Sequence, residues 1–397
     1  SRRRKILLRN FAMPPRKFGK IYKLPEIFSM MIRFHIERNI KFSELPEIFF
    51  RRQDLLTSLK KMYPEKEITA ANYGRTAFEM ILDKYNIKNC KVMIPAFICS
   101  IFHDILKKRN VTPVLIDVEM DSWNISPRTL KKGFDKSARA LITNSMNGLP
   151  CETEKMKKML GKNQIMIEDC AHSLGAKHKN RYVGSIGDAA FFSLYKNLPC
   201  IEGGFALTND ALPDLKRERN TVSNLLKLIY FTGRTANFYK GFKKDERIYE
   251  GELVYEKTGM KKPSTMAERI AAFYAKKLEG IIGARRRIAK ELMRGLAGKN
   301  LAFQSDPYKE HTYTYFSFLL PEKIAGKRIE FLKELRKQGV IGRIIWNKPL
   351  NSDYGSPCAN AKEISERIVG LPINPNYSKK ETAALCEKVS IALNRIL

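Results

Sequence analysis

The sequence has few of the features that mark metal sites, disulfide frameworks or membrane spans. Its 397 residues contain seven cysteines without a CxxC pair and five histidines without an HxxxH pattern. An odd, scattered set of cysteines is typical of reduced thiols in the cytoplasm, so neither a zinc site nor a disulfide framework is expected. No uncharged apolar run reaches the roughly 20 residues of a membrane-spanning helix. The composition predicts a globular, cytoplasmic protein without a metal.

Acidic residues are scarce relative to basic ones. The 41 Asp and Glu residues stand against 73 Lys and Arg, which gives a formal net charge of +32. Such a surface attracts phosphate groups, whether on nucleotides, nucleic acid or anionic lipid. We find no nucleic-acid-binding motif among the basic residues, so nucleic acid is not expected as a substrate.

Residues 1–60 are especially basic, and short apolar clusters lie between the charges. The apolar run near the start is too short and broken for a signal peptide. One interpretation is an arm that packs its apolar residues on the body and leaves its charges in water. The other is an arm that lies peripherally on an anionic membrane surface, at the inner face of the membrane.

From Ile68 onward, short apolar strands alternate with helical patterns. The segments that show this alternation are 91–95, 101–108, 113–117, 139–144, 152–160 and 164–169. Continuous apolar strands separated by helices predict an α/β fold with a mostly parallel sheet covered on both faces. Ligands of such sheets bind beyond the carboxyl ends of the strands.

The second half of the chain predicts a smaller α+β lobe. The basic, aromatic stretch 224–244 is interpreted as an amphipathic helix that covers a cleft, or as a surface that contacts lipid or a long substrate. Helical spacing from Met266 continues to Arg287 and predicts a long connecting helix. The expected parts are an N-terminal arm (1–60), a large domain (61–262), and the connecting helix with a small domain (263–397; strand 312–318, helices 328–338 and 379–397).

Three short motifs carry candidate chemistry. A small-residue turn at 74–76 opens a helix, Asp169 follows a buried strand, and Lys196 comes three residues after Ser193. Taken singly, these are an ordinary helix start, a helix N-cap and a solvated lysine. Together they match what pyridoxal 5'-phosphate (PLP) needs: an anion site for its phosphate, a carboxylate beside its ring nitrogen, and an amine for its aldehyde.

With these motifs, the chain resembles a known family, the DegT/DnrJ/EryC1/StrS sugar aminotransferases. These are PLP-dependent enzymes of fold type I, the aspartate-aminotransferase fold. The resemblance covers roughly residues 68–395. It rests on GRTA (74–77), the Pro95 turn, DVEMDSWNI (117–125), EDCAHSLGA (168–176), the stretch 187–204, the segment 266–278 and ERIVGLPI (366–373).

The resemblance implies a role for each site residue. Lys196 would be the Schiff-base lysine, Asp169 the partner of the pyridinium nitrogen, and His172 the residue beside the ring oxygen. The expected phosphate ligands are Gly74, Arg75, Thr76 and Ser193. The ring-stacking residue is expected after Pro95, with Phe97 as first candidate and Phe102 as second. Ser264 stands where the family has an asparagine that the second subunit lends to the phosphate.

Two departures indicate a compact branch of the family. The hydroxyl residue and the lysine are closer together than usual, and residues 197–201 replace the usual glycine-rich run. The substrate pocket is therefore expected to differ from that of typical members.

The function implied is the transfer of an amino group from an amino acid, glutamate by resemblance, to a keto sugar carried on a nucleotide. Such a reaction belongs to polysaccharide or glycoconjugate biosynthesis, and the family's homodimer is expected. One alternative is a PLP-dependent sugar dehydratase of the same fold. Another is an aminotransferase that acts on a lipid-linked acceptor at the membrane surface.

Overall fold

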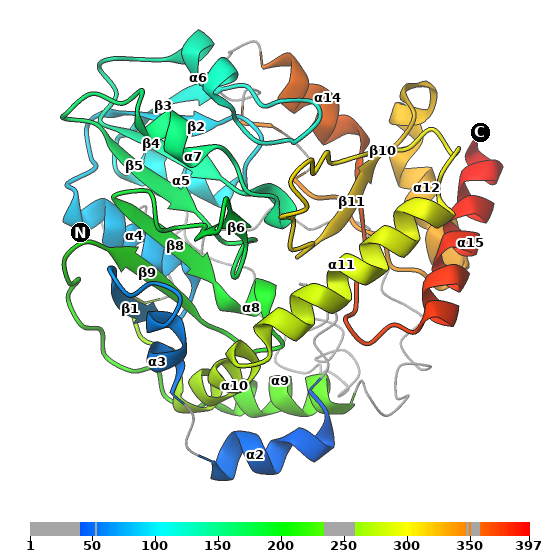
Figure 1. Ribbon diagram of the computed structural model, residues 1–397, viewed down its shortest axis with the longest axis horizontal. Coiled ribbons are helices and arrows are strands. Elements are labelled where there is room, and N and C mark those ends of the chain that lie inside the picture. Colours follow the sequence, from blue (N-terminus) through cyan, green and yellow to red (C-terminus); the bar gives the residue numbers. More distant parts are fainter. Residues whose placement is uncertain (1–39, 52–53, 234–258, 347–348, 351–357) are drawn as a thin grey trace, which may run out of the picture.

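The computed structural model describes residues 40–51, 54–233, 259–346, 349–350 and 358–397 (Figure 1). Its largest element is a seven-stranded sheet with the strand order β1-β9-β8-β5-β4-β2-β3. The strands are β1 (Glu67–Ala71), β2 (Lys91–Pro95), β3 (Thr112–Ile116), β4 (Ala140–Asn144), β5 (Ile165–Asp169), β8 (Ala189–Ser193) and β9 (Gly204–Thr208). A separate hairpin pairs β6 (Lys177–His178) with β7 (Arg181–Tyr182).

Most of this sheet is parallel, as the sequence predicts. Strands β8, β5, β4, β2 and β3 pair in parallel, and β9 runs antiparallel to both β8 and β1. All five residues of β4 and all five of β8 are buried. Strands buried on both faces need continuous apolar sequences, and this explains why these segments do not alternate with polar residues.

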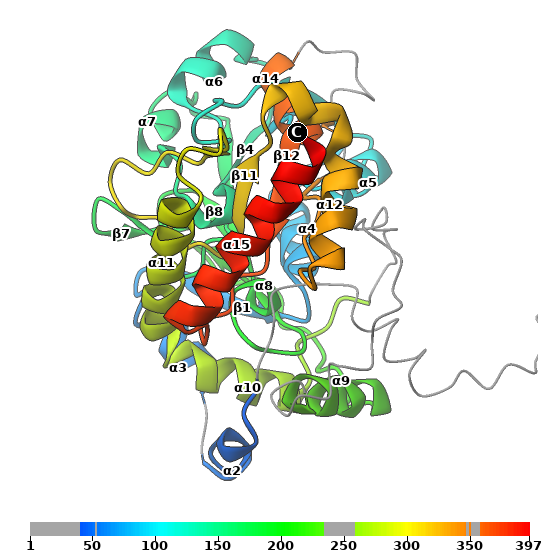
Figure 2. The ribbon, with the colours of Figure 1, turned by 90° about the vertical axis from the view of Figure 1, so that its right-hand side faces the viewer.

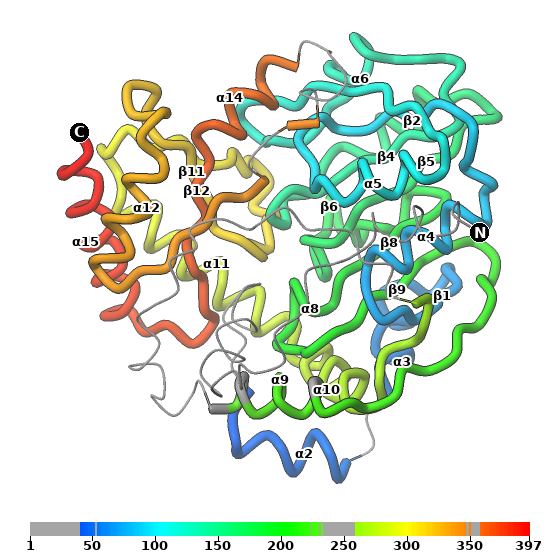
Figure 3. Tube along the Cα trace, turned by 180° about the vertical axis from the view of Figure 1, so that it is seen from behind, coloured from blue at the N-terminus to red at the C-terminus, as the bar shows by residue number. Residues whose placement is uncertain are grey.

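Two hydrophobic cores lie on the two faces of the sheet. In β8, Ala189 and Phe191 belong to one core, whereas Ala190 and Phe192 belong to the other. The first core includes α4 (Gly74–Lys84) and α5 (Ile101–Lys108), which are seen across the sheet in Figure 3. The second includes α3 (Leu55–Lys60) and α10 (Thr265–Ala275). The remaining helices before residue 234 are α2 (Leu45–Phe50), α6 (Pro127–Gly133), α7 (Thr153–Lys157), α8 (Leu194–Asn197) and α9 (Val222–Gly233).

The C-terminal part forms a smaller α+β unit with its own core. Its antiparallel sheet has the order β10-β11-β12. The last helix packs along two others, α11 and α12 (Figure 2). The elements are α11 (Leu278–Gly295), β10 (Ala302–Phe303), β11 (Phe316–Leu319), α12 (Arg328–Lys337), α14 (Ala359–Arg367), β12 (Ile368–Leu371) and α15 (Lys379–Ile396). The domain boundaries proposed from the sequence stay a prediction.

The predicted connecting helix is two helices, because the chain turns at residues 276–277 between α10 and α11. Beyond the turn, Leu278 and Ile282 pack against Gly175, which has a φ of 79°. A Cβ on Gly175 would lie 2.8 Å from Leu278 Cδ2 and 2.7 Å from Ile282 Cδ1. The start of α11 therefore packs closely on a glycine turn.

The predicted strand 312–318 is shorter than expected, since β11 begins only at Phe316. Before it, the Thr312 amide donates to the Gly148 carbonyl oxygen over 3.0 Å. Tyr313 then adopts a φ of 48°. These contacts hold the segment against the large sheet, and they bring Tyr315 to the region between the two sheets.

Part of the N-terminal arm is described, and it packs on the body. Ile40, Ile48, Leu55 and Leu59 are buried in the second core. Residues 1–39 and 52–53 of the predicted arm lie outside the described residues.

The start of the aromatic stretch forms α9, beside the beginning of α10 (Figures 2 and 3). Its Val222, Leu225 and Ile229 are exposed. Residues 234–244 of the predicted stretch are outside the described part of the chain. Among the helices that are described, none has the length and apolar character needed to cross a membrane.

Candidate active site

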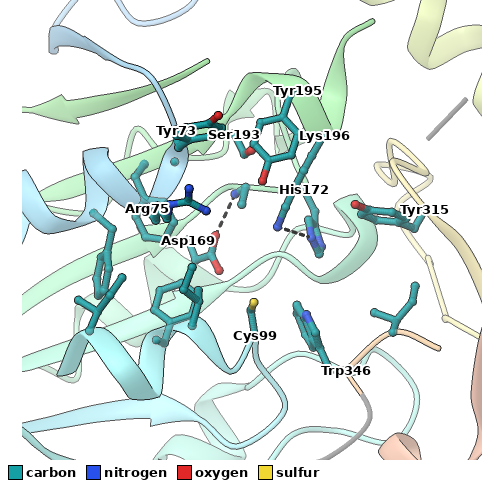
Figure 4. Close-up of a pocket in the computed structure, with 18 residues that line it drawn as sticks. Tyr73, Arg75, Cys99, Asp169, His172, Ser193, Tyr195, Lys196, Tyr315 and Trp346 are labelled. Atoms are coloured by element: carbon teal, nitrogen blue, oxygen red, sulfur yellow. Dashed lines mark hydrogen bonds between the residues drawn. The ribbon is translucent and has the colours of Figure 1, made fainter. Parts of the chain in front are cut away.

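A cavity lies at the carboxyl ends of β5 and β8, where the sequence places ligand binding (Figure 4). It is enclosed on one side by the large sheet and its loops and on the other by residues 315, 345 and 346 of the C-terminal part. Six of the predicted site residues line it. They are Gly74, Arg75, Asp169, His172, Ser193 and Lys196.

Lys196 is presented by α8, the short helix that follows β8. Its neighbour Asn197 is fully buried and fixes the position of this turn. The Asn197 amide donates to the Ala171 carbonyl oxygen at 2.9 Å, while its Oδ1 accepts from the Thr314 hydroxyl at 3.0 Å. The lysine turn, the loop after Asp169 and the segment before β11 therefore meet at one carboxamide. From the sequence, Asn197 is notable only as part of residues 197–201, which replace the glycine-rich run usual in the family.

The helix start at Gly74 packs tightly on the lysine-bearing strand. A Cβ on Gly74 would lie 3.1 Å from the Phe192 carbonyl oxygen and 3.3 Å from Ser193 Cβ. A Cβ on Gly204 would lie only 2.5 Å from the Gly74 nitrogen. Glycine is needed at these positions because two backbones approach closely. The amino end of α4 and the end of β8 consequently form one surface of the cavity.

The Ser193 hydroxyl is buried at the cavity and has no hydrogen-bond partner among the described residues. A buried hydroxyl without a partner is costly, so this group is placed for a ligand. It lies beside the amino end of α4, where backbone N–H groups and the helix dipole favour an anion. The Arg75 side chain also lines the cavity, with its guanidinium carbon 4.4 Å from the ring centre of Tyr73. A phosphate group matches these three features.

Thr76 does not line the cavity. Its side chain is buried and donates to Asn72 Oδ1 at 2.7 Å. Its hydroxyl thus supports the turn before α4, and the phosphate-binding role expected for it stays a prediction.

Asp169 ends β5 and faces the cavity, and its Oδ1 accepts a hydrogen bond from the Ala171 amide at 2.9 Å. Burial raises the pKa of this carboxyl to about 6, although the charge of Lys196 and the Ala171 bond act in the opposite direction. A carboxyl with this pKa is ionised at neutral pH but holds a proton readily. It is suited to pair with a protonated ring nitrogen.

His172 is buried between Lys196 and the wall of the cavity. Its Nε2 lies 3.2 Å from Lys196 Nζ, and its Nδ1 accepts from the Asn147 amide at 3.4 Å. Burial, and then the charge of Lys196, lower the pKa of His172 well below its usual value. The imidazole is therefore neutral and lies within hydrogen-bond distance of the Lys196 amine.

Lys196 is half-buried, and acidic groups face its amine. Burial alone would lower its pKa, but the groups that face it, Tyr315 first and Asp169 among them, outweigh burial and raise the pKa. The amine is thus held as an ammonium when the cavity contains no ligand. It must lose a proton before it can act as a nucleophile.

Two aromatic residues from the C-terminal part complete the cavity, and the sequence did not reveal them. Tyr315 packs edge-on against His172 with ring centres 4.8 Å apart, and its hydroxyl is directed toward His172 and Lys196 in Figure 4. Trp346 stacks on His172 at 5.6 Å and has a φ of 49°. A positive φ is rare for a bulky residue, and such strained backbone is tolerated where the surrounding structure holds it, as at functional sites. Sequence patterns give no signal for it.

Two predicted residues lie elsewhere. Phe97 is fully buried, packs edge-on against Trp346 at 5.0 Å and does not line the cavity, whereas Phe102, the second candidate, does. Ser264 is buried at the start of α10, where its Oγ accepts from the Ala267 amide and from the Asn224 side chain. Its hydroxyl serves as a helix cap here, and its contact with a second subunit stays a prediction.

The chain is similar in sequence to known proteins. The family model of the DegT/DnrJ/EryC1/StrS aminotransferase family matches residues 51–390. The GDP-perosamine synthase of Escherichia coli O157:H7 is 22% identical over 335 residues, which cover 81% of this chain and 84% of that protein.

Solved structures share the fold. PseC of Helicobacter pylori, an aminotransferase involved in the biosynthesis of pseudoaminic acid, has a TM-score of 0.69 at 17% identity, covering 91% of this chain and 99% of that chain. GDP-4-keto-6-deoxymannose-3-dehydratase with a trapped PLP-glutamate geminal diamine has a TM-score of 0.66 at 21% identity, covering 84% and 90%.

Proposed function

The chain belongs to the DegT/DnrJ/EryC1/StrS aminotransferase family and is a PLP-dependent transaminase of fold type I, and from this premise we propose that it aminates a keto sugar carried on a nucleotide. The observation that carries the proposal is the convergence of a half-buried lysine, a buried carboxyl and a buried hydroxyl, unpartnered among the described residues, on one cavity. We propose glutamate as the amino donor, as the resemblance implies.

The residues present fit the cofactor. When bound, PLP supplies an aldehyde for attachment and a ring that accepts electrons from a deprotonated carbon. The Ser193 hydroxyl and the amino end of α4 at Gly74 would bind the phosphate, with the Arg75 guanidinium as a charged partner. Asp169 would hold the proton on the ring nitrogen, because an ionised carboxylate favours a nearby cation.

Lys196 and His172 would handle protons at the reacting end of the site. Nζ of Lys196, when not attached to the cofactor, would remove and return a proton at the substrate carbon. Nε2 of His172 lies 3.2 Å from Nζ, within hydrogen-bond distance of it (Figure 4). His172 is buried, so water has little access to its side of the amine.

The acceptor side of the cavity is aromatic. Tyr315, Ile345 and Trp346 line it from the C-terminal part. Aromatic side chains offer apolar faces to sugar rings, and a chain with a net charge of +32 attracts a diphosphate. The named relative that acts on a GDP-linked sugar supports the same class of acceptor.

The test follows the amino nitrogen of the donor with an isotope label. We expect purified protein, supplied with PLP, 15N-glutamate and nucleotide-linked keto sugars, to release 2-oxoglutarate and to place 15N in the sugar. Lys196→Ala should abolish both products. The matched control is Lys158→Ala, which changes an exposed lysine and should leave both products at the wild-type level. An active protein that transfers nitrogen only to keto acids would contradict a sugar acceptor.

A sugar dehydratase is the second candidate, since a dehydratase is among the solved structures with this fold. The same assay separates the two, because a dehydratase releases the nitrogen as ammonium and leaves no 15N in the sugar. The homodimer, the contact of residues 1–60 with an anionic membrane, a lipid-linked acceptor and the cytoplasmic location all stay predictions. Liposome co-sedimentation with and without residues 1–60 tests the membrane contact.

A further inference from the structure

Cys99 is the thiol of the candidate active site. It lies in the turn between β2 and α5, is 7% exposed and lines the cavity. In Figure 4 its sulfur is directed into the space between Asp169 and His172. Phe97, two residues earlier in the same turn, is fully buried instead. The turn therefore presents a thiol to the cavity, which Phe102 from α5 also lines.

Independent features show that this space is built for a ligand. Ser193, which is 2% exposed, directs to the same cavity a hydroxyl that no described residue pairs with. Asp169 faces the cavity with a carboxyl that accepts a hydrogen bond from the Ala171 amide. Lys196 interacts electrostatically with Cys99 and with Asp169, so these groups surround one small volume. A ring bound by the phosphate site, the acid and the amine would meet the thiol.

We propose that the Cys99 sulfur packs against the face of the bound PLP ring and that Cys99 is a modification site reachable only in the cofactor-free protein. The proposal rests on the proposed function for its cofactor. Sulfur is polarizable and contacts aromatic rings favourably, although it offers less area than an aromatic side chain. The phosphate site and Lys196 therefore hold the cofactor, and Cys99 closes the space beside its ring.

The chemistry of modification is simple. With iodoacetamide, the Cys99 thiol gives its proton to solvent, a carbon–sulfur bond forms, the carbon–iodine bond breaks and iodide leaves. The added group occupies the space of the ring, so the alkylated protein can no longer accept the cofactor. Conversely, a bound cofactor covers the sulfur and prevents the reaction.

The experiment measures the alkylation rate of each cysteine by peptide mass spectrometry. The probe ligand is pyridoxamine phosphate, which has no aldehyde and so cannot react with a thiol or with Lys196. At a concentration 100-fold above its Kd, about one site in a hundred is free, so the Cys99 rate should fall about 100-fold. Cys90, which is partly exposed at the other end of β2, is the internal control and should not change.

The outcomes separate this inference from the proposed function. PLP bound to Lys196 is read from its visible absorbance band and from the mass of the borohydride-reduced protein. If the cofactor binds and Cys99 reacts at an unchanged rate, the inference is wrong and the function stands. If no cofactor binds to Lys196, the proposed function itself fails.

A matched pair of variants tests the reverse direction. After treatment with iodoacetamide, the wild-type protein and Cys90→Ala should no longer bind PLP. Cys99→Ala should still bind it after the same treatment, because the reactive sulfur is gone. Loss of binding in Cys99→Ala only after treatment would mean that another thiol blocks the site, and would overturn the proposal.

Discussion

Asp169→Asn should make the cofactor-free protein more stable at neutral pH while it removes activity. The carboxyl is buried, and burial raises its pKa to about 6 against about 3.9 in an unfolded chain. At about 1.4 kcal/mol per pH unit, ionised Asp169 costs about 3 kcal/mol of folding free energy. Asparagine has nearly the same shape and keeps an acceptor for the Ala171 amide, but it carries no charge.

The sign of the pH dependence follows from the two pKa values. Below about pH 4 the carboxyl is mostly neutral in both states. Between about pH 4 and pH 6 the unfolded chain loses the proton first, so the free energy of unfolding falls as the pH rises, and the full loss is reached above the folded pKa of Asp169. Asp169→Asn lacks this contribution, and at about pH 7.5 it should be more stable by up to about 3 kcal/mol.

The assay is urea unfolding of cofactor-free protein at several pH values from about 4.5 to about 8, which span the folded pKa of Asp169. The difference in free energy of unfolding between Asp169→Asn and wild type should grow across this interval. Asp121 is exposed, so Asp121→Asn should follow the wild-type curve. A variant of Asp169 that is less stable than wild type at neutral pH, or equally dependent on pH, would refute the reasoning.

Three further predictions concern the same site. Ser193→Ala should weaken PLP binding about 10- to 100-fold in a spectroscopic titration, because a hydrogen bond to a charged group contributes about 1.5 to 3 kcal/mol. Unchanged affinity would show that this hydroxyl does not bind the phosphate. Attachment of PLP to Lys196, followed by stopped-flow absorbance, should accelerate as the pH rises, since the raised pKa keeps the amine protonated; a rate that falls with pH would contradict this. Gly204→Ala should lower the unfolding temperature and abolish PLP uptake, because its Cβ would lie 2.5 Å from the Gly74 nitrogen; normal uptake would show that the backbones can separate.

The elements that depend on local pattern could be predicted from the sequence. Continuous apolar segments indicate the parallel strands, and the rule that ligands bind beyond strand ends places Asp169 and Lys196 at one edge of the sheet. Asp169 ends β5 and Lys196 lies in α8, directly after the neighbouring strand β8, and their convergence follows from that topology. Apolar pattern and topology are thus sufficient for this half of the site.

Other parts could not be predicted because they depend on turns and distant contacts. Which residue after Pro95 faces the cavity is decided by the backbone of that turn, so the sequence left Phe97 and Phe102 as alternatives, and it gave no signal for Cys99. Trp346 reaches the site through a positive φ that its sequence does not signal. A serine can serve as a phosphate ligand or as a helix N-cap. Only the structure shows that Ser264 caps α10.

The carboxamide of Asn197 makes the assembly of the site cooperative. Three stretches of chain that are far apart in sequence share hydrogen bonds with this one side chain, which is enclosed by protein on every side. Opening of the lysine turn breaks the bonds to both other stretches, and opening of either of those removes a bond that orients Asn197. Partly assembled arrangements of the site therefore gain little stability. Hydrogen exchange should accordingly show the three stretches losing protection together, as a single unit that is either whole or absent.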